Sequence, residues 1–538
     1  MGVMVFAFIL VAAFALGNIV CHPLSIGPEA ACHLSASMLT ALGQRPFVDF
    51  YEIGSQPTLY LQVPLVVVAR LLRTHPILIF KIVVLALALL SATVLLALAR
   101  LRGPGWHRLY LQLAAILVCL FYGFNYTEFG EAPLFFATTI TPYLFARLSN
   151  QSLPQKLKIV VMLLLLLALL TAPIFVAYFL LVEFALALML LSEGQNLRSY
   201  FGQGRSLLLY LPLFVALPIY LLLAYLTPGY LDSAWTYNNL YFKYFNDQLY
   251  WMEKSPDLRN LIYLSIFFLL VASTGLTRSR EARLFSIASI VGFAFYITSV
   301  STLSCYLMPY FYFALLAALS TLSYLISSLA VRFKQSLRWR KVPFVLLLLL
   351  LPLVILVPWL LMPLFAPASA TVKVSSPLGF RGYSKFYDFS VFASFLLEQS
   401  QADDKVAIYA WQVRPAYPLL LQLLRRPSKF LYLYPFMVFK HGDPEGTEEQ
   451  KAKLAAMQKQ IYQIIEDELT GENPPQLLLI EDGDIRQWFN ESGLMEKISN
   501  RYELLQGVSP TNSDEVEKHP PFEYLAYRNP FAVYKLVR

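Results

Sequence analysis

The stretch GPEAACHLSASMLTALGQRPFVDFYEIGSQPTLYLQVPLVVVARLLR, residues 27–73, follows the first apolar segment of the chain. It carries Glu29, Asp49 and Glu52, three of only twelve carboxylates that precede residue 365. A chain embedded in a bilayer keeps such groups where water or a bound molecule meets them. We therefore expect the chemistry of this protein to lie in this stretch.

Composition indicates a membrane protein with a water-soluble tail. Hydrophobic residues make up 57% of the chain and charged residues 14%, against roughly 45–50% and 25% in soluble proteins. Residues 1–364 hold 12 of the 34 Asp and Glu, and residues 365–538 hold 22. We predict a polytopic α-helical membrane domain over 1–364 and a C-terminal soluble α/β domain over 365–538.

Apolar segments predict about eleven transmembrane helices. They cover about 2–20, 76–100, 108–124, 131–148, 157–171, 173–192, 206–226, 259–275, 282–303, 306–330 and 342–364. Between the first two spans we expect a first outer loop, 21–75, with two juxtamembrane helices over about 29–43 and 57–73. Such short apolar helices with basic ends can lie flat at a membrane surface. A second large outer loop covers 227–258.

Basic residues predict the orientation. With the N-terminus inside, sixteen Lys and Arg fall in inner loops and six in outer loops, as the positive-inside tendency requires. The same assignment places nine of the twelve acids outside. We read the positive surplus as an orientation signal and expect no nucleic-acid partner. The prediction is a multi-pass protein of a bacterial plasma (inner) membrane, with a cytoplasmic N-terminus and a periplasmic C-terminal domain.

The tail alternates apolar runs with amphipathic segments. Runs at 405–410, 430–435, 476–481, 501–506, 522–527 and 531–537 predict strands, and the segments 447–469 and 484–499 predict helices. The first set has the length and composition of strands and the second the spacing of helices. An α/β domain of about 170 residues follows from this pattern.

The first loop resembles that of the C-type glycosyltransferases (GT-C), the superfamily of the protein O-mannosyltransferases and the lipid A aminoarabinose transferase. Bacterial members often show an acid, a His four residues later, a Gly, an Asp-Phe-aromatic-Glu run, and a Pro before a surface helix. The corresponding residues here are Glu29, His33, Gly43, Asp49-Phe50-Tyr51-Glu52 and Pro57. The resemblance implies a GT-C-like fold for the whole chain.

Two positions depart from the family pattern. Glu29 stands where members usually have Asp, and Gln56 stands where many have Lys or a second Pro. A glutamate can still act as a base, whereas the missing Lys removes one expected contact to phosphate and leaves the type of donor open.

The resemblance implies an inverting glycosyltransferase that takes a sugar from a polyprenyl-phosphate donor and passes it to a lipid, glycan or protein acceptor on the outer face. Glu29 is the predicted general base, since partial burial can tune the pKa of a carboxyl for that role. Glu52 and Asp49 are expected to orient the acceptor or a divalent cation. A capping or salt-bridge role for Asp49 is the equal alternative. We assign no metal ligands.

Further residues are expected to contact substrate. Cations would meet the phosphate of the donor, and the family resemblance implies an additional acid near the first. These residues are His33, Arg45 and Gln56 in the first loop, Glu128 and Glu131 between the third and fourth spans, Lys243 in the second outer loop, and Arg259 after it. The alternatives are a solvated turn for Glu128 and Glu131, and an interfacial aromatic girdle for the loop around Lys243.

A transporter or lipid/glycan flippase is the alternative function. Glu183 lies deep in the span 173–192, and an intramembrane carboxylate can bind a coupled ion. Such proteins are built from repeats, and the sequence shows none. A protonated or hydrogen-bonded structural group is the other interpretation of Glu183.

Overall fold

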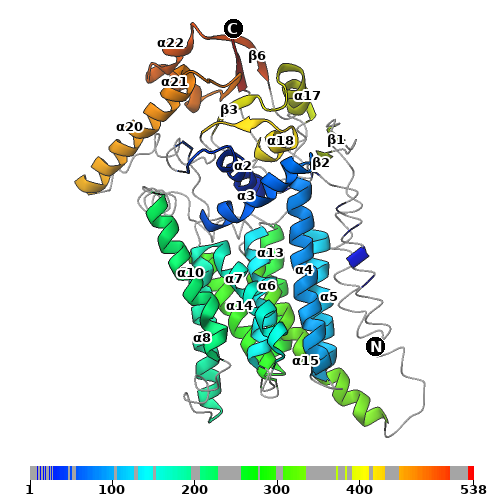
Figure 1. Ribbon diagram of the computed structural model, residues 1–538. Helices are drawn as coiled ribbons and strands as arrows, with labels where there is room; N and C mark the ends of the chain where they lie inside the picture. The colour runs from blue at the N-terminus through cyan, green and yellow to red at the C-terminus, as the bar shows by residue number, and fades with distance from the viewer. Residues whose placement is uncertain are drawn as a thin grey trace. The chain divides into compact units, whose positions relative to one another are not determined.

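The computed structural model in Figure 1 divides into two compact units. The helical unit comprises Met1–Cys21, Lys81–Leu222 and Gln248–Pro367, and the α/β unit comprises His22–Phe80, Leu223–Asp247 and Ala368–Arg538. The structure describes residues 28–46, 49–50, 56–101, 106–125, 131–148, 153–194, 206–227, 256–276, 279–298, 307–334, 371–372, 382–383, 390–410, 416–429, 447–508 and 531–537, with seven single positions before residue 28.

The helices of the helical unit coincide with nine of the predicted spans. They are α4 (Pro76–Leu101), which begins in the α/β unit, α5 (Trp106–Asn125), α6 (Glu131–Leu148), α7 (Gln155–Thr171), α8 (Pro173–Ser192), α10 (Ser206–Leu226), α13 (Pro256–Ser273), α14 (Arg280–Thr298) and α15 (Met308–Lys334). The predicted span 342–364 and most of 2–20 lie outside the described residues. The count of eleven therefore stays a prediction.

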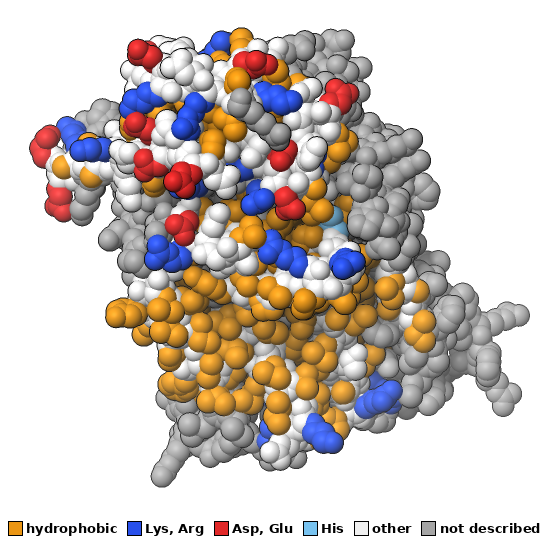
Figure 2. Space-filling view, turned by 45° about the horizontal axis from the view of Figure 1, so that its top comes forward, with side chains coloured by type: hydrophobic (Ala, Val, Ile, Leu, Met, Phe, Trp, Pro, Cys, Tyr) orange, Lys and Arg blue, Asp and Glu red, His pale blue; other side chains and the backbone are white. Residues whose placement is uncertain are grey.

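Three stretches among the described residues are long and apolar enough to cross a membrane. They are Pro76–Leu101, Pro173–Ser192 and Met308–Leu325. Large apolar side chains on the neighbouring helices α7, α8, α10 and α13 are exposed, including Leu163, Phe184, Leu221 and Leu270. Figure 2 shows hydrophobic side chains covering a broad band of the visible face. Apolar helices with an exposed apolar surface are expected where lipid is the solvent.

Helix α15 is the centre of the helical unit. It packs against α5, α6, α13 and α14, and its first half is buried. Small residues let α14 approach it closely: Ser289 Oγ donates a hydrogen bond to the backbone oxygen of Tyr310 at 2.8 Å. One turn later stands Gly292, where a Cβ atom would lie 2.9 Å from the Tyr310 backbone nitrogen. Such contacts are the usual means of holding helices together in lipid.

The α/β unit contains a five-stranded sheet with the order β4-β3-β5-β7-β6. Its strands are β3 (Lys405–Tyr409), β4 (Arg426–Pro427), β5 (Leu477–Glu481), β6 (Tyr502–Val508) and β7 (Phe531–Leu536). Strand β3 is parallel to β4 and β5, whereas β7 is antiparallel to β5 and β6. A two-stranded ribbon, β1 (Thr371–Val372) with β2 (Gly382–Tyr383), lies outside this sheet.

Helices cover the central strand, every residue of which is buried. The helices of the tail are α17 (Ser390–Gln399), α18 (Ala416–Gln422), α20 (Glu448–Thr470), α21 (Asp484–Glu491) and α22 (Leu494–Ile498). Ile461, Ile465 and Leu469 follow one face of α20 and pack in the core with Leu478 of β5, at the spacing expected for one face of a helix.

Four of the six predicted tail strands coincide with β3, β5, β6 and β7. The runs 430–435 and 522–527 lie outside the described residues. The prediction of one continuous helix over 484–499 was wrong. The helix is interrupted between α21 and α22 at Gly493, whose φ is +75°. This left-handed conformation favours glycine and ends a helix.

Two helices of the first loop belong to the α/β unit. They are α2 (Pro28–Ala41) and α3 (Gln56–Leu71), close to the predicted bounds, and they pack against each other. Helix α18 of the tail packs on α2, and Figure 1 draws it in yellow beside the dark blue α2 and α3. The first loop and the tail therefore share one compact unit.

Buried His75, immediately before α4, is neutral in the folded protein. Its Nδ1 accepts a hydrogen bond from the backbone nitrogen of Ile77 at 3.3 Å, so the ring proton lies on Nε2, which is 3.3 Å from the backbone oxygen of Gln422. Loss of solvent on burial lowers the pKa of His75 to about 4, although the hydrogen bond to Gln422 acts in the opposite direction.

We expect acid to loosen this contact. Between about pH 6.5 and pH 4 the unfolded chain binds a proton at His75 that the folded chain excludes, so stability falls as the pH drops through this window, by up to about 3 kcal/mol. Above pH 6.5 the contribution is constant. Melting temperatures in detergent from pH 7 to pH 4 test this, with His75→Asn as the control. Identical pH dependence of both proteins would contradict it.

The close approach of α14 and α15 generates a second expectation. Gly292→Ala places a methyl group against backbone atoms that cannot turn away, so it should lower stability by about 1–3 kcal/mol. Ile290→Ala, at an exposed position of the same helix, should have a much smaller effect. Thermal unfolding in detergent compares the two, and equal melting temperatures would show that the helices tolerate separation.

Candidate functional site

The sequence of the first loop fixes where α2 begins and ends. Pro28 opens α2, a position where its missing N–H costs nothing. At the other end, the Gln44 nitrogen bonds to the Leu39 oxygen at 3.1 Å, and Gly43 has a φ of +88°. This arrangement is a Schellman cap. It gives a structural reason for the glycine in the loop pattern.

A buried hydroxyl joins the two helices. Ser37 Oγ lies 2.8 Å from the backbone oxygen of His33 on its own helix and 3.0 Å from that of Leu59 on α3. It is also 3.4 Å from Gln62 Oε1. His33, Ser37 and Gln62 are all buried. The polar interface fixes the relative register of α2 and α3.

The predicted base, Glu29, lies in the first turn of α2. A negative charge is favoured there by the helix dipole. His33 follows four residues later, so the two residues lie on the same face of the helix. The helical backbone thus places Glu29 and His33 about one turn apart.

Asp49 closes the turn that follows α2. Its Oδ2 accepts a hydrogen bond from the backbone nitrogen of Arg45 at 2.7 Å and lies 3.7 Å from Arg45 Nε. The Asp49 nitrogen in turn donates to the Arg45 oxygen at 2.8 Å. Phe50, the next residue, is completely buried. Asp49 therefore has the salt-bridge role that was the alternative to catalysis. A role of Asp49 in catalysis stays a prediction.

The remaining predicted residues are placed by backbone only or not at all. Gln56 begins α3, Glu131 begins α6, and Arg259 lies in the first turn of α13. Glu52, Glu128 and Lys243 lie outside the described residues. The predicted convergence of Glu29 and Glu52 is therefore untested. In the described part of the chain, no group of three His, Cys, Asp or Glu side chains forms a metal site.

Sequence reasoning missed Lys81. This side chain lies in the second turn of α4 and is 1% exposed, and α4 is long and apolar enough to cross a membrane. A charged residue inside an apolar span is costly and is a functional candidate by default. The signal is visible in PILIFKIVVLALALL, residues 76–90, where Lys81 is the single charged residue.

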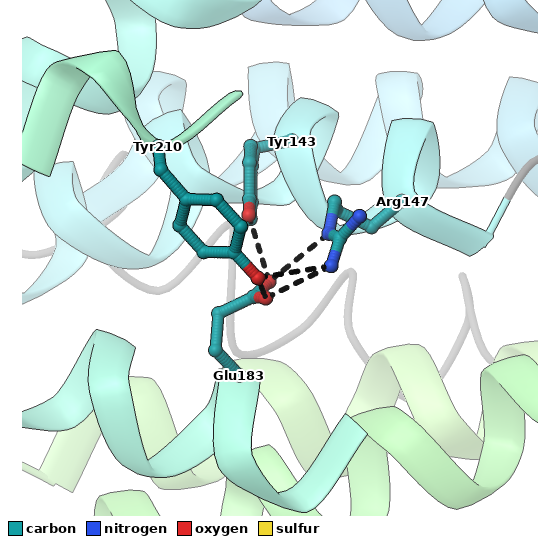
Figure 3. A network of polar contacts seen from close by, with 4 residues as sticks. All are labelled: Tyr143, Arg147, Glu183 and Tyr210. Carbon is teal, nitrogen blue, oxygen red and sulfur yellow. Dashed lines mark hydrogen bonds and ion pairs between the residues drawn. The ribbon is translucent and has the colours of Figure 1, made fainter. Parts of the chain in front are cut away.

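Figure 3 shows a second buried polar group, in the helical unit. Glu183 of α8 accepts hydrogen bonds from Tyr143 at 2.8 Å and from Tyr210 at 3.0 Å. Arg147 Nη2 lies 3.2 Å from Glu183 Oε2, and its Nε lies 3.4 Å from Oε1. The four residues come from α6, α8 and α10, so the carboxylate ties three helices together.

These contacts support the hydrogen-bonded structural interpretation of Glu183. Both oxygens face donors, which is the arrangement of an ionised carboxylate. The side chains of Arg147 and Glu183 are 9% and 6% exposed. Because the arginine already neutralises the carboxylate, a coupled cation would have to displace it. The network therefore gives the transporter alternative no support.

Solved structures resemble the chain over nearly its whole length. The chain shares its fold with ArnT. The crystal structure of ArnT from Cupriavidus metallidurans in the apo state matches with a TM-score of 0.52 and 12% identity, over 99% of this chain and 98% of that chain. The same ArnT bound to undecaprenyl phosphate gives 0.47 and 12%, over 98% and 97%. Comparison with protein-family models and with curated proteins finds no match.

The Glu183 network leads to an expectation about stability. Glu183→Gln leaves the Arg147 charge buried and uncompensated, which should cost about 3–5 kcal/mol. The double variant Glu183→Gln/Arg147→Gln removes both charges and should recover much of this loss. Melting temperatures of the three proteins in detergent form the test, and additive losses in the double variant would mean that the pair is not coupled.

Proposed function

We propose that the protein is a membrane glycosyltransferase that uses a polyprenyl-phosphate-linked sugar and acts, with inversion, on the outer face of a bacterial inner membrane. The observation that carries the proposal is the GT-C fold, which matches ArnT over nearly the whole of both chains. Fold alone does not define function, so the proposal also draws on the first-loop acid and on the buried lysine of α4.

The proposed reaction is a single displacement at the anomeric carbon. The acceptor hydroxyl attacks that carbon, its proton passes to Glu29, and the bond to the donor phosphate breaks with its electron pair on the phosphate oxygen. Negative charge therefore grows on the leaving group, where a fixed cation lowers the barrier. We assign this role to Lys81, since a desolvated ammonium group interacts with phosphate more strongly than a hydrated one.

Helix α3 supports an approach of the donor from the bilayer. One face is buried through Leu59, Gln62, Val66 and Ala69. The opposite face exposes the apolar side chains of Leu61, Pro64, Val67, Val68 and Leu71. Two exposed basic residues, Arg70 and Arg73, stand at the C-terminal end of the helix and just beyond it. An exposed apolar stripe beside basic residues suits a helix at the membrane interface. A lipid donor could reach the loop along that surface.

The other predicted residues keep their proposed roles. Asp49 and Glu52 would orient the acceptor, and the remaining side chains would contact donor or acceptor. These are His33, Arg45, Gln56, Glu128, Glu131, Lys243 and Arg259. The proposal retains a periplasmic C-terminal domain from residue 365, a cytoplasmic N-terminus, and a lipid, glycan or protein acceptor.

Purified protein in lipid nanodiscs, given a radiolabelled polyprenyl-phosphate sugar and candidate acceptors, tests this proposal. Glu29→Gln should lower kcat by about 10²–10⁴-fold, the usual contribution of a general base, while donor binding persists. Lys81→Met should weaken donor binding as well as turnover. Glu503→Gln, on an exposed position of β6, should leave both unchanged.

Three outcomes would count against the proposal. Wild-type turnover in Glu29→Gln would remove the assigned base, and unaltered donor binding in Lys81→Met would remove the assigned cation. Movement of lipid or sugar across sealed vesicles without any transfer would favour the transporter alternative.

A further inference from the structure

One residue of the tail contacts both ends of the first loop, once through its side chain and once through its backbone. Gln422, the last residue of α18, donates a hydrogen bond from Nε2 to the backbone oxygen of Leu24 at 3.0 Å. Its own backbone oxygen faces His75 Nε2 at 3.3 Å. Leu24 precedes α2 and His75 precedes α4, so the contacts reach the entry and the exit of the loop.

We propose that Gln422 is a positioning residue for the transferase reaction: it fixes α2, which carries Glu29, relative to the start of α4. This inference rests on the proposed function, because it assigns catalytic meaning to the order of α2. It gives the C-terminal domain a part in the reaction that is independent of any acceptor it binds.

Burial makes these two hydrogen bonds decisive for the loop. Gln422 is 2% exposed, His75 is 6% exposed and Leu24 is 1% exposed. Water cannot replace a lost partner at such a site, and an unsatisfied buried group costs about 1–3 kcal/mol. A conformation of the loop that separates from Gln422 is therefore disfavoured.

The tail holds Gln422 rigidly through Arg425. This buried guanidinium donates to Ser400 through Nε and Nη2, each at 2.7 Å, and to the Leu423 oxygen through Nη1 at 2.6 Å. Leu424, between Gln422 and Arg425 in the sequence, has a φ of +55°. This left-handed conformation is uncommon for a bulky residue and persists where the surrounding contacts hold it. The turn after α18 is thus built as a fixed anchor.

His75 passes this constraint into α4. Its Nδ1 accepts from the Ile77 nitrogen at 3.3 Å, so the residue that bonds to the tail is also the cap of the helix. Lys81 follows His75 by six residues on that helix, which corresponds to about 9 Å along the axis. The anchor therefore reaches the start of α4 as well as α2.

The test replaces Gln422 by Leu, which has similar volume but no donor. Gln487→Leu, at an exposed glutamine of α21 in the same tail, is the matched control. Hydrogen–deuterium exchange of intact protein in nanodiscs should show faster exchange in 28–41, by about tenfold or more, with no change in 477–481 or 531–536. In the transfer assay, kcat should fall at least tenfold while KM for the donor stays within twofold.

The outcomes separate the two proposals. Unchanged exchange in 28–41, or an equal effect of Gln487→Leu, overturns the positioning role. A fall in donor affinity that accounts for the whole loss of turnover also overturns it. Absence of transfer by the unaltered protein refutes the proposed function instead, and leaves the exchange result as an independent test of the anchor.

A second variant covers the case in which Gln422→Leu unfolds the tail. His75→Asn retains an oxygen that can cap Ile77 but is too short to reach the Gln422 oxygen. It should reproduce the loss of kcat with an intact tail, and exchange at the start of α4, residues 76–80, should become faster. Wild-type exchange and turnover in His75→Asn would overturn the proposal.

Discussion

Charges removed from water dominate the architecture of this protein, because lipid and the protein interior cannot solvate them. The helical unit meets this constraint at Glu183 by bringing an arginine and two tyrosines from other helices to one carboxylate. The α/β unit meets it in the same way in its core, where Glu468 contacts Lys405 at 2.6 Å and the Lys429 nitrogen at 2.9 Å. Removing one partner of such a pair would leave the other charge buried and uncompensated.

The local sequence was sufficient for most elements. Apolar length predicted the helices from α4 to α15, and Gly43 and Pro28 mark the ends of α2 by their backbone preferences. The two strands with the clearest apolar runs, β5 and β7, were also evident. One helix was predicted over 484–499 because the amphipathic spacing continues across Gly493. The positive φ of this glycine separates α21 from α22.

Partners distant in the sequence could not be predicted. Glu183 was identified as a buried acid, yet Arg147 lies 36 residues away on another helix. The distance from His75 to Gln422 is 347 residues, and neither residue type signals the other. Asp49 shows the opposite case: its partner Arg45 is four residues away, so the salt-bridge alternative was available from sequence. Lys81 lies inside a span, so it takes no part in the loop charges that predict the orientation.

The grouping of residues 22–80 with residues 368–538 has a consequence for biogenesis. A ribosome adds roughly 5–20 residues per second, so α2 would wait roughly 20–75 seconds before α18 is synthesised. During that interval the surface that α18 later covers stays open. Insertion of the intervening helices must therefore proceed without the contact that completes the α/β unit, and the last step of maturation is the docking of a late-made segment onto an early one.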